Sequence, residues 1–142
     1  MPLALIADDD ADIRDLLSLA VARTGAQTVL AEDGREAVRM LEDMSPDIIL
    51  LDVQMPGLSG IEVCWWIRRQ RHLVHVPVIL VSSRTSPFEI DAGLLAGANH
   101  YVTKPFSPAH IMAVVAQLLT ARVALPPPAA VVIPHLPPRR DY

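Results

Sequence analysis

The sequence predicts an α/β fold in which one parallel β-sheet is covered by helices on both faces. Short apolar segments recur along the chain, and amphipathic segments of helical length separate them. Several of the amphipathic segments begin with a helix-capping pattern. Strands that alternate with helices in this way are joined by right-handed crossovers and form a parallel sheet. In such sheets ligands bind at the carboxyl ends of the strands, so we expect a functional site there.

Five apolar segments are predicted to be strands. The third of them is a continuous apolar run bounded by Pro46 and Pro56, which is typical of a strand buried on both faces. In chain order the predicted strands are Leu3 to Ala7, Gln27 to Ala31, Asp47 to Asp52, Val76 to Val81 and His100 to Val102.

Five helices are predicted between and after these strands, and their ends are marked by capping residues. Asp10 is the expected N-cap of the first helix. Gly25 and Gly97 stand where helix C-caps are expected. Three other helices begin with Asp or Ser followed at the capping-box spacing by Glu, namely Asp33 with Glu36, Ser59 with Glu62, and Ser86 with Glu89.

Length and composition indicate a single ordinary globular domain. At 142 residues the chain can bury one good core. Hydrophobic residues make up 51% and charged residues 20% of the chain. The formal net charge of -4 offers no clustered basic face for a phosphate backbone, so direct nucleic-acid binding is not expected.

Cysteine usage and hydropathy predict a cytoplasmic location. The single Cys64 excludes an intrachain disulfide and fits a reducing compartment. The N-terminus runs directly into acidic residues, unlike a signal peptide. No segment approaches the roughly 18 uninterrupted apolar residues of a membrane-spanning helix, so membrane insertion is not expected.

The composition changes abruptly after about Arg122. Six of the 13 prolines lie in the last part of the chain, where a regular helix or strand is not expected. We therefore predict a folded domain over residues 1–122 and a proline-rich, disordered tail over residues 123–142. Docking of this tail on a partner is the alternative.

Polar side chains follow the predicted strands at the sheet edge where ligands bind. Asp8 and Asp9 follow the first strand, Asp52 ends the third, Ser82 follows the fourth and Lys104 follows the fifth. Carboxylates this close repel one another by about 4 kcal/mol per pair at an effective dielectric constant near 20. A divalent cation relieves that repulsion, and an all-oxygen ligand set favours Mg²⁺.

Lys104 is the chain's only lysine, beside 11 arginines. Its ammonium is a point charge suited to a single carboxylate or phosphoryl oxygen. The Ser82 hydroxyl can donate a hydrogen bond to the same group. Together with the carboxylates, these residues predict a phosphoryl-transfer site in which Asp52 is the nucleophile and a metal ion neutralises developing charge.

Four motifs stand in the same order, and at the same intervals, as in a known family. They are Leu-Ile-Ala-Asp-Asp-Asp, Ile-Leu-Leu-Asp-Val-Gln-Met-Pro-Gly, Val-Ile-Leu-Val-Ser-Ser and Tyr-Val-Thr-Lys-Pro-Phe. With them, residues 3 to about 121 resemble the receiver domain of bacterial two-component response regulators, with a single-domain architecture like that of chemotaxis regulators. Each motif is weak alone, but the four together are specific.

This resemblance implies a flavodoxin-like, doubly wound five-stranded sheet with strand order 2-1-3-4-5. It implies that Asp52 accepts a phosphoryl group from the phosphohistidine of a histidine kinase. Asp9 and Asp52 would bind Mg²⁺ directly, Asp8 would hold it largely through water, and the backbone carbonyl of Gln54 would complete the protein's ligands.

The resemblance also assigns roles around the phosphoryl group. Ser82 and Lys104 would contact its oxygens, and Tyr101 stands at the position of the family's aromatic switch residue. Gln54 and Arg84 occupy positions that tune dephosphorylation. Arg84 would either contact the phosphoryl group and lengthen its lifetime or point into solvent. Phosphorylation would then shift the population of a surface formed by the fourth helix, fifth strand and fifth helix.

Two rival functions differ in what they require of the site. A metal-dependent phosphohydrolase of the haloacid dehalogenase type would need a carboxylate two residues after the nucleophile, where this chain has Gln54. A phosphorylation-independent interaction module would not need the complete site. The leading hypothesis is a phosphoacceptor switch, not an enzyme, whose partners are a histidine kinase or phosphotransfer protein and a downstream protein target.

Trp65 and Trp66 are adjacent on the predicted third helix. Neighbouring helical side chains point about 100° apart, so the two rings cannot both face the same core. They either cover the helix surface or form a contact patch for a partner or for a homodimer.

Overall fold

The computed structural model describes residues 1–124, and these form a five-stranded parallel sheet with the order β2-β1-β3-β4-β5. The predicted fold class and strand order are therefore confirmed. The strands are β1 (Leu3–Ala7), β2 (Gln27–Ala31), β3 (Ile48–Asp52), β4 (Val78–Ser82) and β5 (His100–Thr103).

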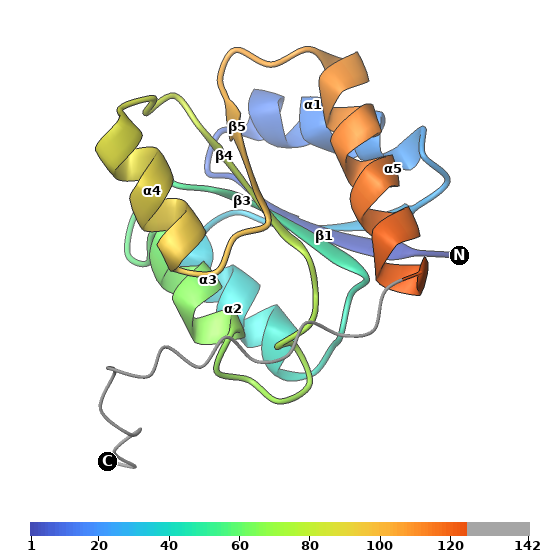
Figure 1. Ribbon diagram of the computed structural model, residues 1–142, viewed down its shortest axis with the longest axis horizontal. Helices are drawn as coiled ribbons and strands as arrows, with labels where there is room; N and C mark the ends of the chain where they lie inside the picture. Colours follow the sequence, from blue (N-terminus) through green and yellow to red (C-terminus); the bar gives the residue numbers. More distant parts are fainter. Residues whose placement is uncertain (125–142) are drawn as a thin grey trace.

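Helices cover both faces of the sheet (Figure 1). The cluster of buried side chains on one face joins α1 and α5 to the sheet, and the cluster on the other face joins α2 and α3. The helix α4 contacts β5 and α3 at one side of the sheet. The helices are α1 (Ala11–Ala22), α2 (Gly34–Glu42), α3 (Gly60–Ile67), α4 (Pro87–Leu95) and α5 (Pro108–Ala124).

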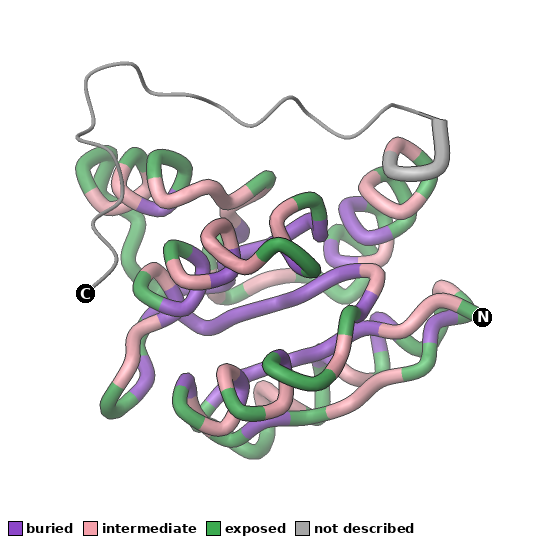
Figure 2. The backbone as a smooth tube through the Cα atoms, turned by 90° about the horizontal axis from the view of Figure 1, so that it is seen from below, coloured by how far each residue is buried: buried purple, intermediate pink, exposed green. Residues whose placement is uncertain are grey.

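The central strands form the core of the molecule (Figure 2). Every residue of β3 and of β4 is buried, as expected for strands covered on both faces. Alternate residues of β3 face the two clusters, with Ile49 and Leu51 on the α2–α3 side and Ile48 and Leu50 on the α1–α5 side. This burial holds the carboxyl end of β3 in place.

Four strand boundaries differ slightly from the prediction. The third strand begins at Ile48, because Asp47 instead bonds Leu3 at the strand entry, with its side chain accepting from the Leu3 N–H at 2.8 Å. The fourth begins at Val78, two residues later than predicted, because Pro77 has no N–H and the Val76 N–H closes a turn. The fourth and fifth strands each end one residue later, at Ser82 and Thr103.

The predicted helix caps are present. Asp10 caps α1 by accepting from the backbone N–H groups of Asp12 and Ile13. Ser59 forms a complete capping box with Glu62, whereas Asp33 and Ser86 accept from the backbone N–H of the predicted Glu. Gly25 and Gly97 adopt positive φ angles of 92° and 111°, the backbone region that helix ends reserve for glycine.

The last helix continues to Ala124, so the predicted boundary at residue 122 falls within its final turn. The rest of the predicted proline-rich tail, residues 125–142, lies outside the described residues. None of the helices among residues 1–124 is both long and apolar enough to cross a membrane.

Candidate functional site

The candidate site lies at the carboxyl edge of the sheet, where the sequence predicted it. Asp52 is the last residue of β3 and is only 4% exposed. Its Oδ1 accepts a hydrogen bond from the Gln54 N–H at 3.2 Å. A Cβ on Gly60, the first residue of α3, would collide with the Asp52 backbone carbonyl, so glycine is needed for α3 to begin this close to β3. The end of β3 and the start of α3 thus fix the position of Asp52.

Lys104 joins two carboxylates that are far apart in the sequence. Its Nζ lies 3.1 Å from Asp8 Oδ2 and 3.4 Å from Asp52 Oδ1. Asp8 is fully buried, and its other oxygen accepts from the Asp10 N–H at 2.9 Å. Lys104 itself is 18% exposed and is followed by a cis peptide bond to Pro105. The ammonium therefore neutralises part of the buried negative charge.

Asp8, Asp9 and Asp52 together fit a divalent cation. One carboxylate oxygen from each lies within 4.8 Å of the other two, and they are the only such group of three among residues 1–124. Two of the carboxylates are buried, while Asp9 is exposed to solvent. Three carboxylates against one ammonium leave excess negative charge, and hard oxygen ligands match Mg²⁺. The triad is typical of a magnesium site.

Burial and charge shift the acidity of the central groups. Burial and the neighbouring Asp8 raise the pKa of Asp52 to about 6, against the Lys104 charge and the Gln54 N–H, which lower it. Burial alone would lower the pKa of Lys104, but its hydrogen bond to Asp8 and the charges of Asp52 and Asp8 outweigh burial and raise it. Lys104 is therefore a permanent cation of the pocket.

Ser82 and the two predicted tuning residues lie around the same edge. Ser82 is fully buried, and its Oγ accepts from the Arg84 N–H at 3.0 Å. The Gln54 amide satisfies its neighbours when its oxygen faces Arg84 and its nitrogen faces Ser83: the oxygen then accepts from Arg84 Nη2 at 2.9 Å and from Nε, and the nitrogen donates to Ser83 Oγ at 3.1 Å. The Arg84 side chain is 54% exposed and its guanidinium contacts Gln54, so its predicted effect on the phosphoryl group stays a prediction.

Tyr101 is partly buried on β5, and its hydroxyl donates to the Arg84 carbonyl at 2.7 Å. Its ring lies beside Gly93 of α4, where an added Cβ would come within 3.2 Å of a Tyr101 ring carbon. The predicted switch residue thus connects β5 to α4 and to the loop that follows β4.

Glu89 was missed as a site residue by the sequence analysis, which assigned it only to a helix cap. Its carboxylate lies 3.5 Å from the Arg84 guanidinium, and both residues line a groove of about 670 Å³ with Asp9 and Gln54. No sequence signal indicates this pairing, because Arg84 lies in the loop before α4 and the conformation of that loop sets its distance from Glu89.

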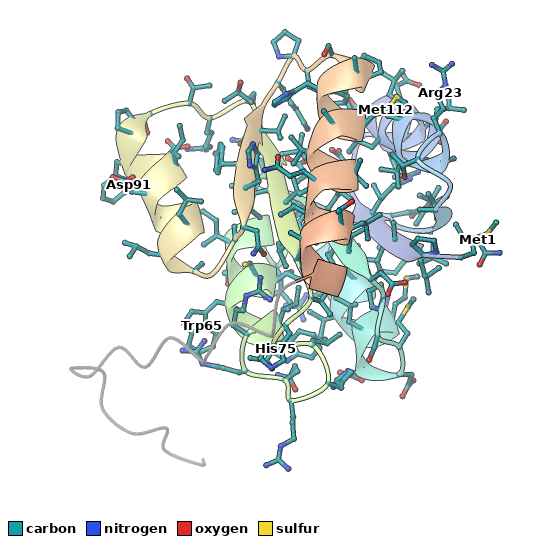
Figure 3. The ribbon with its side chains drawn as sticks, turned by 45° about the vertical axis from the view of Figure 1, so that its right-hand side comes forward. Met1, Arg23, Trp65, His75, Asp91 and Met112 are labelled. Atoms are coloured by element: carbon teal, nitrogen blue, oxygen red, sulfur yellow. The ribbon has the colours of Figure 1, made fainter. Side chains whose placement is uncertain are left out.

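The adjacent tryptophans behave differently, as their helical spacing predicted. Trp66 packs against the core on the α2–α3 side. Trp65 is 52% exposed and lies on the outside of the molecule (Figure 3), with the Arg69 guanidinium 3.1 Å from its ring centroid. Trp65 is thus covered in part by Arg69, which follows the end of its helix. Its predicted role in partner or homodimer contacts stays a prediction.

Comparison with known proteins identifies the family. Residues 4–116 match the family model of the response regulator receiver domain, so the chain belongs to this family. Among curated proteins it resembles the uncharacterized transcriptional regulatory protein YrkP of Bacillus subtilis, with 43% identity over 115 residues that cover 80% of this chain and 48% of YrkP. The chain spans about half the length of the curated relatives it matches.

Solved receiver domains have the same architecture. The receiver domain of the Francisella response regulator 1452 is 33% identical, with a TM-score of 0.78 over 84% of this chain and 98% of that one. The receiver domain of the sensor histidine kinase PA1611 from Pseudomonas aeruginosa is 27% identical, with a TM-score of 0.77 over the same shares, and holds a magnesium ion in its active-site cleft.

Family membership decides between the functional classes. The chain contains a receiver domain, the phosphoacceptor domain of two-component systems, which is phosphorylated on aspartate at a magnesium site. Receiver domains partner with histidine kinases and are not turnover enzymes, so the phosphohydrolase alternative is set aside.

Proposed function

We propose that Asp52 is the phosphoacceptor. A carboxylate oxygen of Asp52 attacks the phosphorus of a phosphohistidine; the new oxygen–phosphorus bond forms as the nitrogen–phosphorus bond breaks, and the released imidazole nitrogen takes a proton. The observation that carries this proposal is the placement of Asp52 at the end of a fully buried strand, 4% exposed and 3.4 Å from the Lys104 ammonium. The donor is a histidine kinase or a phosphotransfer protein.

Ser82 and Lys104 bind the transferred group. The Ser82 oxygen already accepts from the Arg84 N–H, so its own hydrogen is left to donate to a phosphoryl oxygen. Lys104 lies between Asp8 and Asp52 and offers its remaining hydrogens to another phosphoryl oxygen. Both groups stabilise negative charge where it develops during transfer.

Asp8, Asp9 and Asp52 hold Mg²⁺, with the Gln54 backbone carbonyl as a further ligand and Asp8 acting largely through water. The three carboxylate oxygens within 4.8 Å support this assignment. When bound, the ion neutralises negative charge on the carboxylates and the phosphoryl oxygens. The protein's part is to supply the oxygen ligands at a buried sheet edge.

Phosphorylation shifts the population of a protein-binding surface over α4, β5 and α5. The phosphoryl oxygens draw the Ser82 hydroxyl inward, and Tyr101 reorients from its bond to the Arg84 carbonyl. The downstream partner is another protein or a second copy of this chain, in the cytoplasm. Absence of direct nucleic-acid binding stays a prediction, since YrkP is named as a transcriptional regulatory protein.

Incubation with acetyl phosphate and Mg²⁺ tests the proposal. We expect an acid-labile phosphoryl adduct, detected by intact mass, that is lost in Asp52→Asn and retained in Asp91→Asn. Asp91 is an exposed carboxylate on α4 and serves as the matched control. No adduct on the unmodified protein would support the phosphorylation-independent module, and adduct that survives in Asp52→Asn would place the acceptor elsewhere.

A further inference from the structure

Arg84 is held at four points around the phosphoacceptor pocket. Its N–H donates to Ser82 Oγ at 3.0 Å, and its carbonyl accepts from the Tyr101 hydroxyl at 2.7 Å. Its guanidinium donates to the Gln54 amide oxygen and lies 3.5 Å from Glu89 Oε1. The backbone of Arg84 is therefore fixed by Ser82 and Tyr101. Among residues 1–124, its guanidinium is bound only by the side chains of Gln54 and Glu89, which can release it.

Glu89 is the one charged group of this set on α4. Its side chain is 28% exposed, but its second oxygen, Oε2, is buried with no hydrogen-bond partner in residues 1–124. A carboxylate in this setting depends on a nearby cation, because its buried oxygen is not compensated by hydrogen bonds. Arg84 supplies that charge in the unphosphorylated protein.

The Arg84 guanidinium has a second possible anionic acceptor besides the Glu89 carboxylate, namely a phosphoryl group on Asp52. Arg84 and Glu89 line the same groove as Asp9 and Gln54, and Gln54 donates its backbone N–H to Asp52. A phosphoryl group on Asp52 would present anionic oxygens to this side of the pocket, and guanidinium groups bind phosphoryl and carboxylate oxygens alike. Glu89 and a phosphorylated Asp52 therefore compete for Arg84.

We propose that Glu89 is a positioning residue that draws Arg84 toward α4 and thereby shortens the lifetime of phosphorylated Asp52. This inference rests on the proposed function. In hydrolysis a water oxygen bonds to phosphorus, the bond to the Asp52 oxygen breaks and leaves the Asp52 carboxylate, and both protons of the water leave with inorganic phosphate. Arg84 on the phosphoryl oxygens covers the side from which water approaches; Arg84 on Glu89 leaves that side open.

Glu89→Gln removes the charge and keeps the shape of the side chain. After acetyl phosphate is removed, we expect the adduct of this variant to decay with a half-life about two to five times longer than that of the unmodified protein, the range that release of a partly exposed ion pair permits. Arg84→Ala and the double variant Arg84→Ala/Glu89→Gln should share one half-life, since Glu89 acts only through Arg84. Asp91→Asn, which removes a carboxylate from the same helix, should leave the half-life unchanged.

Two results would overturn the inference while leaving the proposed function intact. One is an adduct that forms on Asp52 but decays at the same rate with and without the Glu89 charge. The other is a Glu89→Gln effect that persists in the Arg84→Ala background, which would place its cause in α4 itself. Failure to form any adduct on the unmodified protein would instead reject the proposed function and this inference with it. Thermal unfolding of each variant verifies that the compared proteins are folded.

Discussion

At the scale of single residues, the pocket is governed by carboxylates held together against their repulsion. Asp8 and Asp52 are buried and share one ammonium, that of Lys104. Burial and the Asp8 charge leave Asp52 with a pKa of about 6, so its ionised form is disfavoured in the folded protein. The same repulsion between carboxylates makes the pocket a good binding site for cations.

The raised pKa predicts how Asp52 affects stability as pH changes. Between its ordinary value of 3.8 and about 6 the folded state binds more protons at this residue than the unfolded state, so its contribution to stability falls as pH rises through that window. With a chelator present, Asp52→Asn should therefore be about 1–3 kcal/mol more stable than the unmodified protein at pH 7.5. Urea unfolding should show the difference shrinking toward pH 4; a constant difference would contradict the shift.

Lys104→Met should destabilise the metal-free protein, because it removes the cation that compensates the buried carboxylates. Without the ammonium, the Asp8 and Asp52 charges are left uncompensated in a buried site. We expect metal-free stability to fall by about 1–3 kcal/mol, with much of the loss recovered on adding Mg²⁺. Arg23→Met removes an exposed cation at the end of α1 and should change urea midpoints little (Figure 3). Equal losses in the two variants would mean that net charge, not the pocket, is responsible.

At the scale of elements, the site depends on where strands end and helices begin. The start of α3 lies against the end of β3, and a capping box at Ser59 and Glu62 fixes that start. Near the amino end of β4, Arg68 at the end of α3 donates to the Gly97 carbonyl at 2.9 Å and to the Val76 carbonyl at 2.6 Å. Burial lowers the pKa of Arg68, yet its hydrogen bonds tie α3 to the segments that flank β4 and α4.

Gly60→Ala should disrupt the junction of β3 and α3. The added Cβ would meet the Asp52 carbonyl carbon at 2.8 Å and Val53 Cα at 3.1 Å, both backbone atoms that cannot rotate away. We expect a loss of about 1–3 kcal/mol in urea unfolding and a slower phosphorylation of Asp52. Gly25→Ala is the contrast: its φ of 92° disfavours alanine by about 1–2 kcal/mol, but no atom lies within 4 Å of the added Cβ. The phosphorylation rate of Gly25→Ala should be normal. A slower rate in this variant as well would show that the clash at Gly60 is not the cause of slow phosphorylation.

At the scale of the whole molecule, parallel topology brings distant residues to one edge. Asp8 and Lys104 are 96 residues apart in the sequence and 3.1 Å apart in space. The two hydrophobic clusters hold the sheet from both sides, so the acid pocket is built on a rigid support. Metal binding at this edge is therefore linked to the stability of the entire domain.

Magnesium should raise the thermal unfolding midpoint of the protein. A ligand that binds only the folded state stabilises it by about 2.7 kcal/mol at one hundred times its dissociation constant, which corresponds to a rise of roughly 5–10 °C for a domain of this size. Asp9→Asn should lose most of this rise, because one of the three carboxylates is removed.

Asp91→Asn is again the matched control for this titration and should keep the full rise. An identical magnesium effect in the Asp9→Asn and unmodified proteins would place the ion elsewhere. Differential scanning fluorimetry with and without a chelator measures both variants.

The sequence by itself determined the order of elements, the strand order through its motifs, and the residues at the strand ends. These features depend on local chemistry: apolar periodicity, capping side chains such as Ser59, and charges such as Asp52 placed directly after buried runs. The exact strand limits at Asp47 and Val76 were wrong because the Asp47 side chain bonds Leu3 of another strand, while the Val76 N–H closes a local turn instead of extending β4.

Only the tertiary structure decided how the polar side chains share their charges. The bonds from Lys104 to Asp8 and Asp52, and from Arg84 to Gln54 and Glu89, join different strands, loops and helices. Such contacts depend on loop conformation and on the packing of helices against the sheet, which neighbours in the chain do not specify. The residues of the pocket were predictable because they directly follow the strands. The position of the Arg84 guanidinium between Gln54 and Glu89 was not, because loop conformation decides it.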